Sequence, residues 1–100
     1  MTATETKLRG CFIIEPKVFK DPRGYFFESF SQNKFNALIG QKINFVQDNE
    51  SFSSKGVLRG LHFQTGAYAQ AKLVRVIEGA VLDVVVDMRK ESPTFSEHFS

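Results

Sequence analysis

The sequence has no tryptophan, one cysteine, three prolines and two histidines in 100 residues. The lone Cys11 excludes an intrachain disulfide, and the polar opening MTATETKLRG lacks the apolar stretch of a signal peptide. Positive and negative charges nearly balance at 13 against 11, with no basic run that would coat a nucleic acid or an anionic membrane. We therefore expect a cytoplasmic protein that binds neither nucleic acid nor a membrane.

Phenylalanine is plentiful, with eleven residues beside two tyrosines. The rings either fill the core or line a cavity for a flat or sugar-like ligand, and composition alone leaves both interpretations open. The length and the 42% hydrophobic content allow one modest core, so we expect residues 1–100 to form a single domain.

Short runs of β-forming residues separated by turn residues predict a mostly β protein. We expect strands over residues 11–20, 25–30, 43–53, 57–64, 72–77 and 80–89. Pro16 favours an edge strand or a bend between two short strands, and DPRG at residues 21–24 favours a turn. Ser31 is expected to cap one short helix near residues 32–39, which ends at Gly40.

The runs KLVRVI and AVLDVVVDMR are separated only by Glu78–Gly79, which predicts a tight hairpin. Pairing the residues that flank this turn makes Lys72 and Asp83 diagonal neighbours on an apolar face. The opposite face is also almost wholly apolar, so both faces of the hairpin are expected to be covered. Such a sheet belongs in a sandwich or barrel, and about six strands predict an incomplete double-sheet jelly roll.

Charged residues on these strands suit proton abstraction next to a carbonyl group. His62 is either a hydrogen-bonded core residue or a general base. Lys72 and Asp83 either form a structural ion pair, or Lys72 stabilises an enolate oxygen with Asp83 in support. Arg23 and Arg59 are either solvated or bind a phosphorylated part of the substrate.

A metal site is not expected. Gln64 stands two residues beyond His62, where a second histidine ligand would be needed, and His98 lies in an irregular tail. The glycines are too dispersed for a phosphate-binding loop. We therefore predict chemistry without a metal ion.

Three stretches together resemble one enzyme family: KVFKDPRGYFFESF, FVQDNESFSSKGVLRGLHFQ and AQAKLVRVIEGAVLDVVVDMRKESPTF. They are similar in order and spacing to the dTDP-4-dehydrorhamnose 3,5-epimerase family, across nearly the whole chain. The resemblance implies a cupin-type jelly roll that works as a homodimer without cofactor. It also implies epimerisation of C3 and C5 in dTDP-4-dehydro-6-deoxy-D-glucose, a 4-keto-6-deoxy sugar linked to dTDP, within dTDP-L-rhamnose biosynthesis.

At the positions that match the family motifs, the resemblance implies that His62 is the base and that Lys72 holds the C4 enolate oxygen. It also implies that Asp83 supports Lys72. It places six more residues around the nucleotide sugar: Arg23 and Arg59 at the pyrophosphate, and Phe26, Glu28, Gln47 and Asn49 along the site, with Phe19 a weaker match. Strict alternation would put Arg59 and His62 on opposite faces of one strand. Gly60 between them permits a bulge or turn that resolves this conflict.

Members of the family continue past SPTF, and the additional strands carry an acid tyrosine and an aspartate that orients the histidine. We therefore expect this sequence to be a truncated form of an ordinary epimerase. Two alternatives remain: a relative that inverts one carbon or moves the keto group, and a non-catalytic dTDP-binding or dimerisation module.

Overall fold

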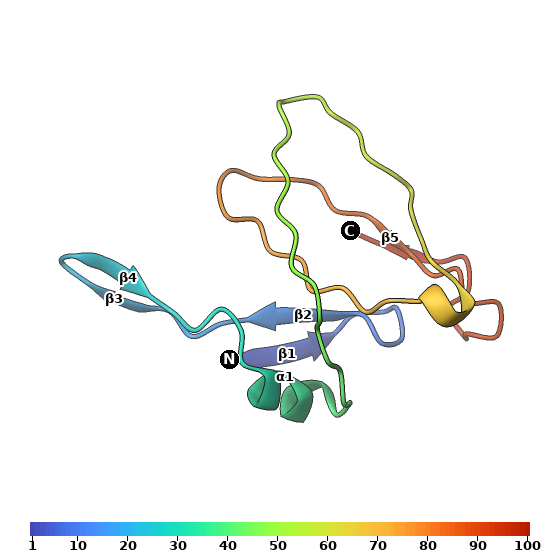
Figure 1. The fold of residues 1–100 in the computed structure, drawn as a ribbon, viewed down its shortest axis with the longest axis horizontal. Coiled ribbons are helices and arrows are strands. Elements are labelled where there is room, and N and C mark those ends of the chain that lie inside the picture. Colours follow the sequence, from blue (N-terminus) through green and yellow to red (C-terminus); the bar gives the residue numbers. More distant parts are fainter. The chain divides into compact units, whose positions relative to one another are not determined.

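The computed structural model describes residues 1–100 and contains short strands with one α-helix (Figure 1). The elements in chain order are β1 (Thr2–Glu5), β2 (Phe12–Glu15), β3 (Phe19–Asp21), β4 (Gly24–Phe26), α1 (Gln32–Ile39), the 3₁₀ turn η1 (Gly66–Tyr68), β5 (Val85–Val86) and β6 (His98–Phe99). The strands form three two-stranded antiparallel sheets, β1–β2, β3–β4 and β5–β6. No helix has the length and apolar character that crossing a membrane requires.

The first hairpin, β1–β2, lies where the sequence predicted only a polar opening and the start of a strand. Its connection is closed by backbone bonds from Thr6 N to Cys11 O (2.8 Å) and from Cys11 N to Leu8 O (3.0 Å). Leu8 lies beneath this connection and is 1% exposed, the most buried side chain of the protein. The polar residues of β1 form a strand because β2 supplies their hydrogen-bond partners, which composition does not reveal.

The bend predicted at Pro16 and the turn predicted at DPRG are both confirmed. The bend separates β2 from β3, and residues 21–24 join β3 to β4 in a second hairpin that extends away from β1–β2 (Figure 1). Phe19 pairs with Phe26 across this hairpin. The predicted strand at residues 25–30 is shorter than expected, because β4 ends at Phe26.

Helix α1 has the predicted bounds, with Ser31 at its N-cap and Gly40 at its C-cap. Gly40 has φ 68°, a left-handed conformation that glycine adopts at little cost, and its N–H donates to Asn36 O. Ser31 makes no side-chain capping bond, so only its position was predicted correctly. The helix buries Phe35, which contacts the Phe30 ring at 5.9 Å between centroids.

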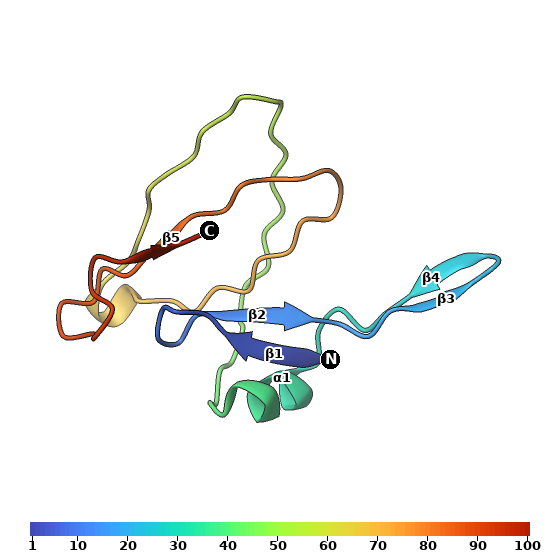
Figure 2. The same ribbon diagram turned by 180° about the vertical axis from the view of Figure 1, so that it is seen from behind.

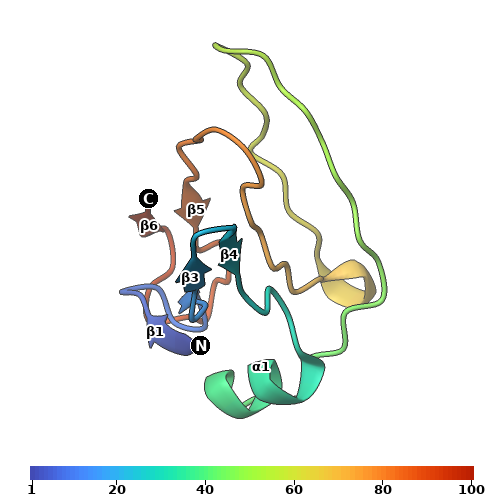
Figure 3. The same cartoon turned by 90° about the vertical axis from the view of Figure 1, so that its left-hand side faces the viewer.

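The last sheet, β5–β6, corrects two predictions. Only Val85–Val86 of the expected 80–89 strand is in a ladder, and its partner is His98–Phe99 in the tail that was expected to be irregular (Figure 3). The predicted hairpin between residues 72–77 and 80–89 is wrong for this structure, since the chain around Glu78–Gly79 forms a bend without flanking strands.

The contacts within the chain define two compact units, one made of residues 1–42 and 76–100 and the other of residues 43–75. The second unit contains η1 but no strand, so the strands predicted at 43–53, 57–64 and 72–77 are not formed (Figure 2). A strand requires a second strand paired with it, and none of the three sheets includes this segment. Most of its apolar side chains are exposed, with Leu58 91% accessible. The single domain expected from length remains a prediction.

Candidate functional site

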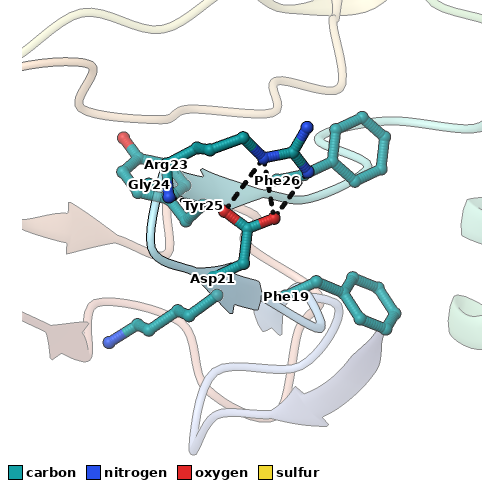
Figure 4. A pocket seen from close by; sticks show the side chains of 7 residues that line it. Phe19, Asp21, Arg23, Gly24, Tyr25 and Phe26 are labelled. Atoms are coloured by element: carbon teal, nitrogen blue, oxygen red, sulfur yellow. Dashed lines mark hydrogen bonds and ion pairs between the residues drawn. The ribbon is translucent and has the colours of Figure 1, made fainter.

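The β3–β4 hairpin presents Arg23 at its tip, held by Asp21 on the preceding strand (Figure 4). The Asp21 carboxylate accepts hydrogen bonds from the Arg23 backbone N–H at 2.8 Å and from Arg23 Nη2 at 2.7 Å. A carboxylate that bonds the backbone two residues ahead is the contact that aspartate makes in tight turns. The turn thus fixes the direction in which the Arg23 side chain leaves the backbone.

This ion pair shifts the pKa of both partners in the direction that favours their charged forms. The Arg23 guanidinium lowers the pKa of Asp21 below its ordinary value, and the Asp21 carboxylate raises the pKa of Arg23. The Arg23 side chain is nevertheless 91% exposed. Arg23 is therefore oriented by Asp21 while most of its surface remains open to a ligand.

Aromatic rings line a shallow hollow of about 260 Å³ beside this arginine (Figure 4). Its walls are Phe19, Lys20, Asp21, Arg23, Gly24, Tyr25 and Phe26. A second hollow of about 290 Å³ is lined by Met1, Lys17, Phe19, Phe26, Glu28 and Lys34. Phe19 and Phe26 contribute to both hollows, so the structure brings Arg23, Phe26 and Glu28 into one neighbourhood. Cations beside flat rings suit a ligand with phosphate groups and a planar base.

Glu28 and Lys17 also contact other side chains that line the second hollow. Glu28 Oε1 accepts from Lys34 Nζ at 2.9 Å, which ties the segment after β4 to helix α1. Lys17 Nζ lies 5.2 Å from the centroid of the Phe19 ring, a cation–π distance. These contacts place one negative and two positive side chains around the second hollow.

The second unit carries most of the other predicted residues. Gln47 Nε2 donates to Asn49 Oδ1 at 3.2 Å, so two predicted substrate contacts are joined to each other. Arg59 donates from Nε to Ser53 Oγ at 2.9 Å and from Nη2 to Phe52 O at 3.0 Å. The segment before RGLHFQ thus holds the first residue of that motif.

Gly60, between Arg59 and His62, has a backbone conformation that favours glycine. Gly60 has φ 105°, a conformation that the predicted bulge or turn at this glycine requires and that other residues rarely adopt. A Cβ on Gly60 would lie 3.5 Å from the His62 backbone nitrogen and 3.8 Å from Nδ1. Both are ordinary contact distances, so the positive φ, rather than a lack of space, favours glycine at this position.

His62, Lys72 and Asp83 are all exposed, whereas the sequence predicted them in covered strands. Asp83 belongs to the unit of residues 1–42 and 76–100, and His62 and Lys72 belong to residues 43–75. The pairing of Lys72 with Asp83 depended on the hairpin that does not form here. Their catalytic roles remain predictions.

The strongest polar network lies around Asp87, which the sequence analysis did not single out. The Asp87 side chain is 2% exposed. Its carboxylate accepts hydrogen bonds from Arg89 Nε at 2.9 Å, Arg89 Nη2 at 3.0 Å, Ser92 Oγ at 2.6 Å and Thr94 Oγ1 at 2.6 Å. Arg89 Nη2 also donates to Arg9 O in the β1–β2 connection. Chiefly through Arg89, and then through the two hydroxyls, this network lowers the pKa of Asp87 well below its ordinary value.

Asp21, Ser53 and Asp87 are therefore the polar partners that sequence reasoning missed. The signal for both aspartates was available, because each stands two residues before an arginine in an Asp-x-Arg sequence. Ser53 had no such signal, since six residues separate it from Arg59. No group of three or more histidine, cysteine, aspartate or glutamate side chains is arranged to hold a metal ion. The absence of a metal from the chemistry remains a prediction.

A sequence model of the family described as dTDP-4-dehydrorhamnose 3,5-epimerase matches residues 5–100. The dTDP-4-dehydrorhamnose 3,5-epimerase of Salmonella typhimurium is 59% identical over 97 residues, which cover 97% of this chain and 53% of that protein. The corresponding enzyme of Methanothermobacter thermautotrophicus is 55% identical over 93 residues, covering 93% of this chain and 49% of that protein. The chain thus spans about half the length of the curated relatives that it matches.

Solved structures agree with these sequence matches. The dTDP-4-dehydrorhamnose 3,5-epimerase of Elizabethkingia anophelis NUHP1 matches with a TM-score of 0.92 at 55% identity, covering 99% of this chain and 54% of that chain. The enzyme of Bacillus anthracis, solved with TDP and PPi bound, matches with a TM-score of 0.91 at 44% identity, covering 98% and 56%. The predicted fold class, a partial cupin-like fold of strands with one short helix, is confirmed.

Proposed function

The chain belongs to the dTDP-4-dehydrorhamnose 3,5-epimerase family, and from that premise we propose that the whole protein is an isomerase of dTDP-L-rhamnose biosynthesis. It epimerises C3 and C5 of dTDP-4-dehydro-6-deoxy-D-glucose to give dTDP-4-dehydro-L-rhamnose. The observation that carries the proposal is the match over residues 5–100, which includes the RGLHFQ motif and every predicted site residue.

The proposed chemistry is removal of a proton from the carbon next to the C4 ketone. His62 takes the proton, since imidazole changes protonation near neutral pH. The electrons move toward the ketone oxygen, where the Lys72 ammonium stabilises the enolate more strongly than the neutral ketone. Asp83 supports Lys72 in its charged form. Return of a proton to the opposite face of the carbon inverts its configuration.

Substrate binding is assigned to the aromatic hairpin and to the segment before RGLHFQ. Arg23 and Arg59 bind the pyrophosphate, and Phe26, Glu28, Gln47 and Asn49 line the nucleotide-sugar site. The exposure of Arg23 and the hydrogen bonds that orient both arginines support this assignment. Guanidinium groups suit phosphate because their paired N–H donors match two phosphate oxygens.

The whole protein is further proposed to act in the cytoplasm as a homodimer, without metal or organic cofactor. The many large apolar side chains that are exposed in this chain, among them Phe52 and Leu58, are surface that further strands of the whole protein or a partner chain would cover. Apolar surface of this extent is normally covered in a native protein. Sedimentation of the full-length protein would measure the oligomeric state.

Product analysis tests the proposed activity directly. The full-length protein is incubated with dTDP-4-dehydro-6-deoxy-D-glucose, and the sugar is analysed by NMR. Inversion at both C3 and C5 is the expected result. Inversion at one carbon or movement of the keto group would assign a related activity instead, and dTDP binding in calorimetry with no turnover would assign a binding module.

A further inference from the structure

The Arg59 guanidinium is held along one edge by two neighbouring residues. Its Nε donates to Ser53 Oγ at 2.9 Å, and its Nη2 donates to the backbone carbonyl of Phe52 at 3.0 Å. All of these atoms lie in the unit of residues 43–75, so the arrangement does not depend on the other unit. A turn follows directly, in which Val57 N donates to Ser54 O at 3.3 Å. Two adjacent acceptors thus fix the plane of the guanidinium.

These two hydrogen bonds leave several N–H donors of the Arg59 guanidinium available to a ligand. A guanidinium carries five N–H groups, one on Nε and two on each terminal nitrogen. Ser53 and Phe52 occupy the Nε group and one group on Nη2. Both N–H groups of Nη1 and one of Nη2 remain, and together they form the fork that binds two oxygens of a phosphate.

The acceptors that hold Arg59 are neutral, unlike the partner of Arg23. A hydroxyl and a carbonyl orient the guanidinium without cancelling its charge, whereas the Asp21 carboxylate neutralises much of the charge of Arg23. Neutral acceptors therefore give Arg59 a defined direction and a full positive charge. That combination favours an anionic ligand.

We propose that Ser53 is the positioning residue of Arg59, orienting its guanidinium toward the phosphate groups of a nucleotide-linked substrate. The inference rests on the proposed function, in which Arg59 binds pyrophosphate. Ser53 touches Arg59 and not the reacting atoms, so its loss weakens binding and leaves the proton-transfer step intact.

Calorimetry with dTDP and steady-state kinetics on the full-length protein test this role. Ser53→Ala should raise the Kd for dTDP and the KM for the nucleotide sugar about three- to tenfold with kcat unchanged, the usual effect of losing one hydrogen bond that makes a typical net contribution. Ser53→Thr keeps the hydroxyl and should restore both constants. Ser54→Ala is the matched control, because Ser54 contributes its backbone carbonyl to the turn, and it should leave both constants unchanged.

A double-variant comparison separates positioning from independent binding. Arg59→Ala should weaken dTDP binding more than Ser53→Ala, and adding Ser53→Ala to Arg59→Ala should cause no further loss. Unchanged dTDP affinity in Ser53→Ala, unchanged affinity in Arg59→Ala, or equal effects of Ser53→Ala in both backgrounds would each overturn the proposal. If the wild-type protein fails to convert the sugar, the proposed activity fails, while the dTDP affinities still decide the role of Ser53.

Discussion

Two Asp-x-Arg sequences in this protein make the same local contact in different surroundings. At the tip of the β3–β4 hairpin, the Asp21 and Arg23 side chains are 45% and 91% exposed. Beyond β5, the Asp87 side chain is 2% exposed and the Arg89 side chain 58% exposed. In both, the carboxylate accepts from the backbone N–H and the guanidinium of the arginine two residues ahead.

The difference lies in what surrounds each pair. The Asp87 carboxylate also accepts hydrogen bonds from the Ser92 and Thr94 hydroxyls. Arg89 donates to the backbone carbonyl of Arg9. The second pair therefore links the β1–β2 connection to the loop before β6. Arg23 has no comparable second anchor among the contacts of its hairpin. Local sequence therefore determines whether the ion pair forms. The surroundings of the pair determine whether it stabilises the fold or presents an arginine to a ligand.

Removing the buried carboxylate charge should have the largest effect. Asp87→Asn weakens the hydrogen bonds of Arg89 and of the two hydroxyls at a site closed to water, so we expect the Tm of the full-length protein to fall by on the order of 10 °C. Thermal unfolding monitored by circular dichroism measures it. Glu91→Gln, an exposed acid in the same loop, is the control and should leave the Tm unchanged. Equal Tm values for Asp87→Asn and wild type would remove the distinction between the two pairs.

Acid should destabilise the protein through the same carboxylate. Because folding lowers the pKa of Asp87 below its ordinary value of 3.8, its contribution to stability is fully present above that value and is lost as pH falls below it. The urea midpoint of the wild type should therefore decrease progressively as pH falls below about 4. The decrease should be shallower in Asp87→Asn. Parallel pH profiles for the two proteins would contradict this role.

Arg23 should matter for ligand binding and little for stability. Arg23→Lys keeps the charge but loses the paired donors, so we expect the Kd for dTDP to rise about tenfold with the Tm unchanged. Calorimetry and thermal unfolding of the same samples measure both quantities. Lys42→Arg, at an exposed position that lines neither hollow, is the control for general changes of the surface. If Arg23→Lys lowered the Tm strongly and left the dTDP affinity unchanged, the pair at Arg23 would be the one that stabilises the fold, contrary to this account.

The smallest effect is expected at Asp21. Exposed ion pairs contribute little to stability, so Asp21→Asn should change the Tm by less than about 2 °C. Its direct comparison with Asp87→Asn isolates burial, since the same substitution is made in the same local sequence. A fall in Tm as large as that of Asp87→Asn would show that burial does not separate the two pairs.

Features governed by neighbouring residues were predictable from the sequence. The bounds of α1, the bend at Pro16 and the DPRG turn all follow from residues within a few positions of one another. The ladders were predicted poorly, because β1 and the β5–β6 pair depend on which segments meet. The β-branched run at residues 72–77 illustrates the same limit, since a strong propensity forms no strand without a hydrogen-bonded neighbour.

The residues of the candidate site also differ in how well the sequence predicted their placement. Sequence motifs identified Arg23, Phe26 and Glu28, and the structure places them in one neighbourhood around the two hollows. The proximity of Lys72 to Asp83 was inferred from a hairpin register, and it remains a prediction because the two residues belong to different compact units. Side chains that meet through long-range strand pairing cannot be placed from local periodicity alone.

The central claim is that His62 removes the protons at C3 and C5. The decisive measurement is deuterium incorporation from heavy water into dTDP-4-dehydro-6-deoxy-D-glucose by the full-length wild type and by His62→Asn, with His98→Asn as the matched histidine control. NMR of the sugar reports each carbon separately, and circular dichroism verifies that the variants are folded. We predict deuterium at both carbons with the wild type and with His98→Asn, and none with His62→Asn. Deuterium at both carbons with folded His62→Asn, at the wild-type rate, would contradict the account.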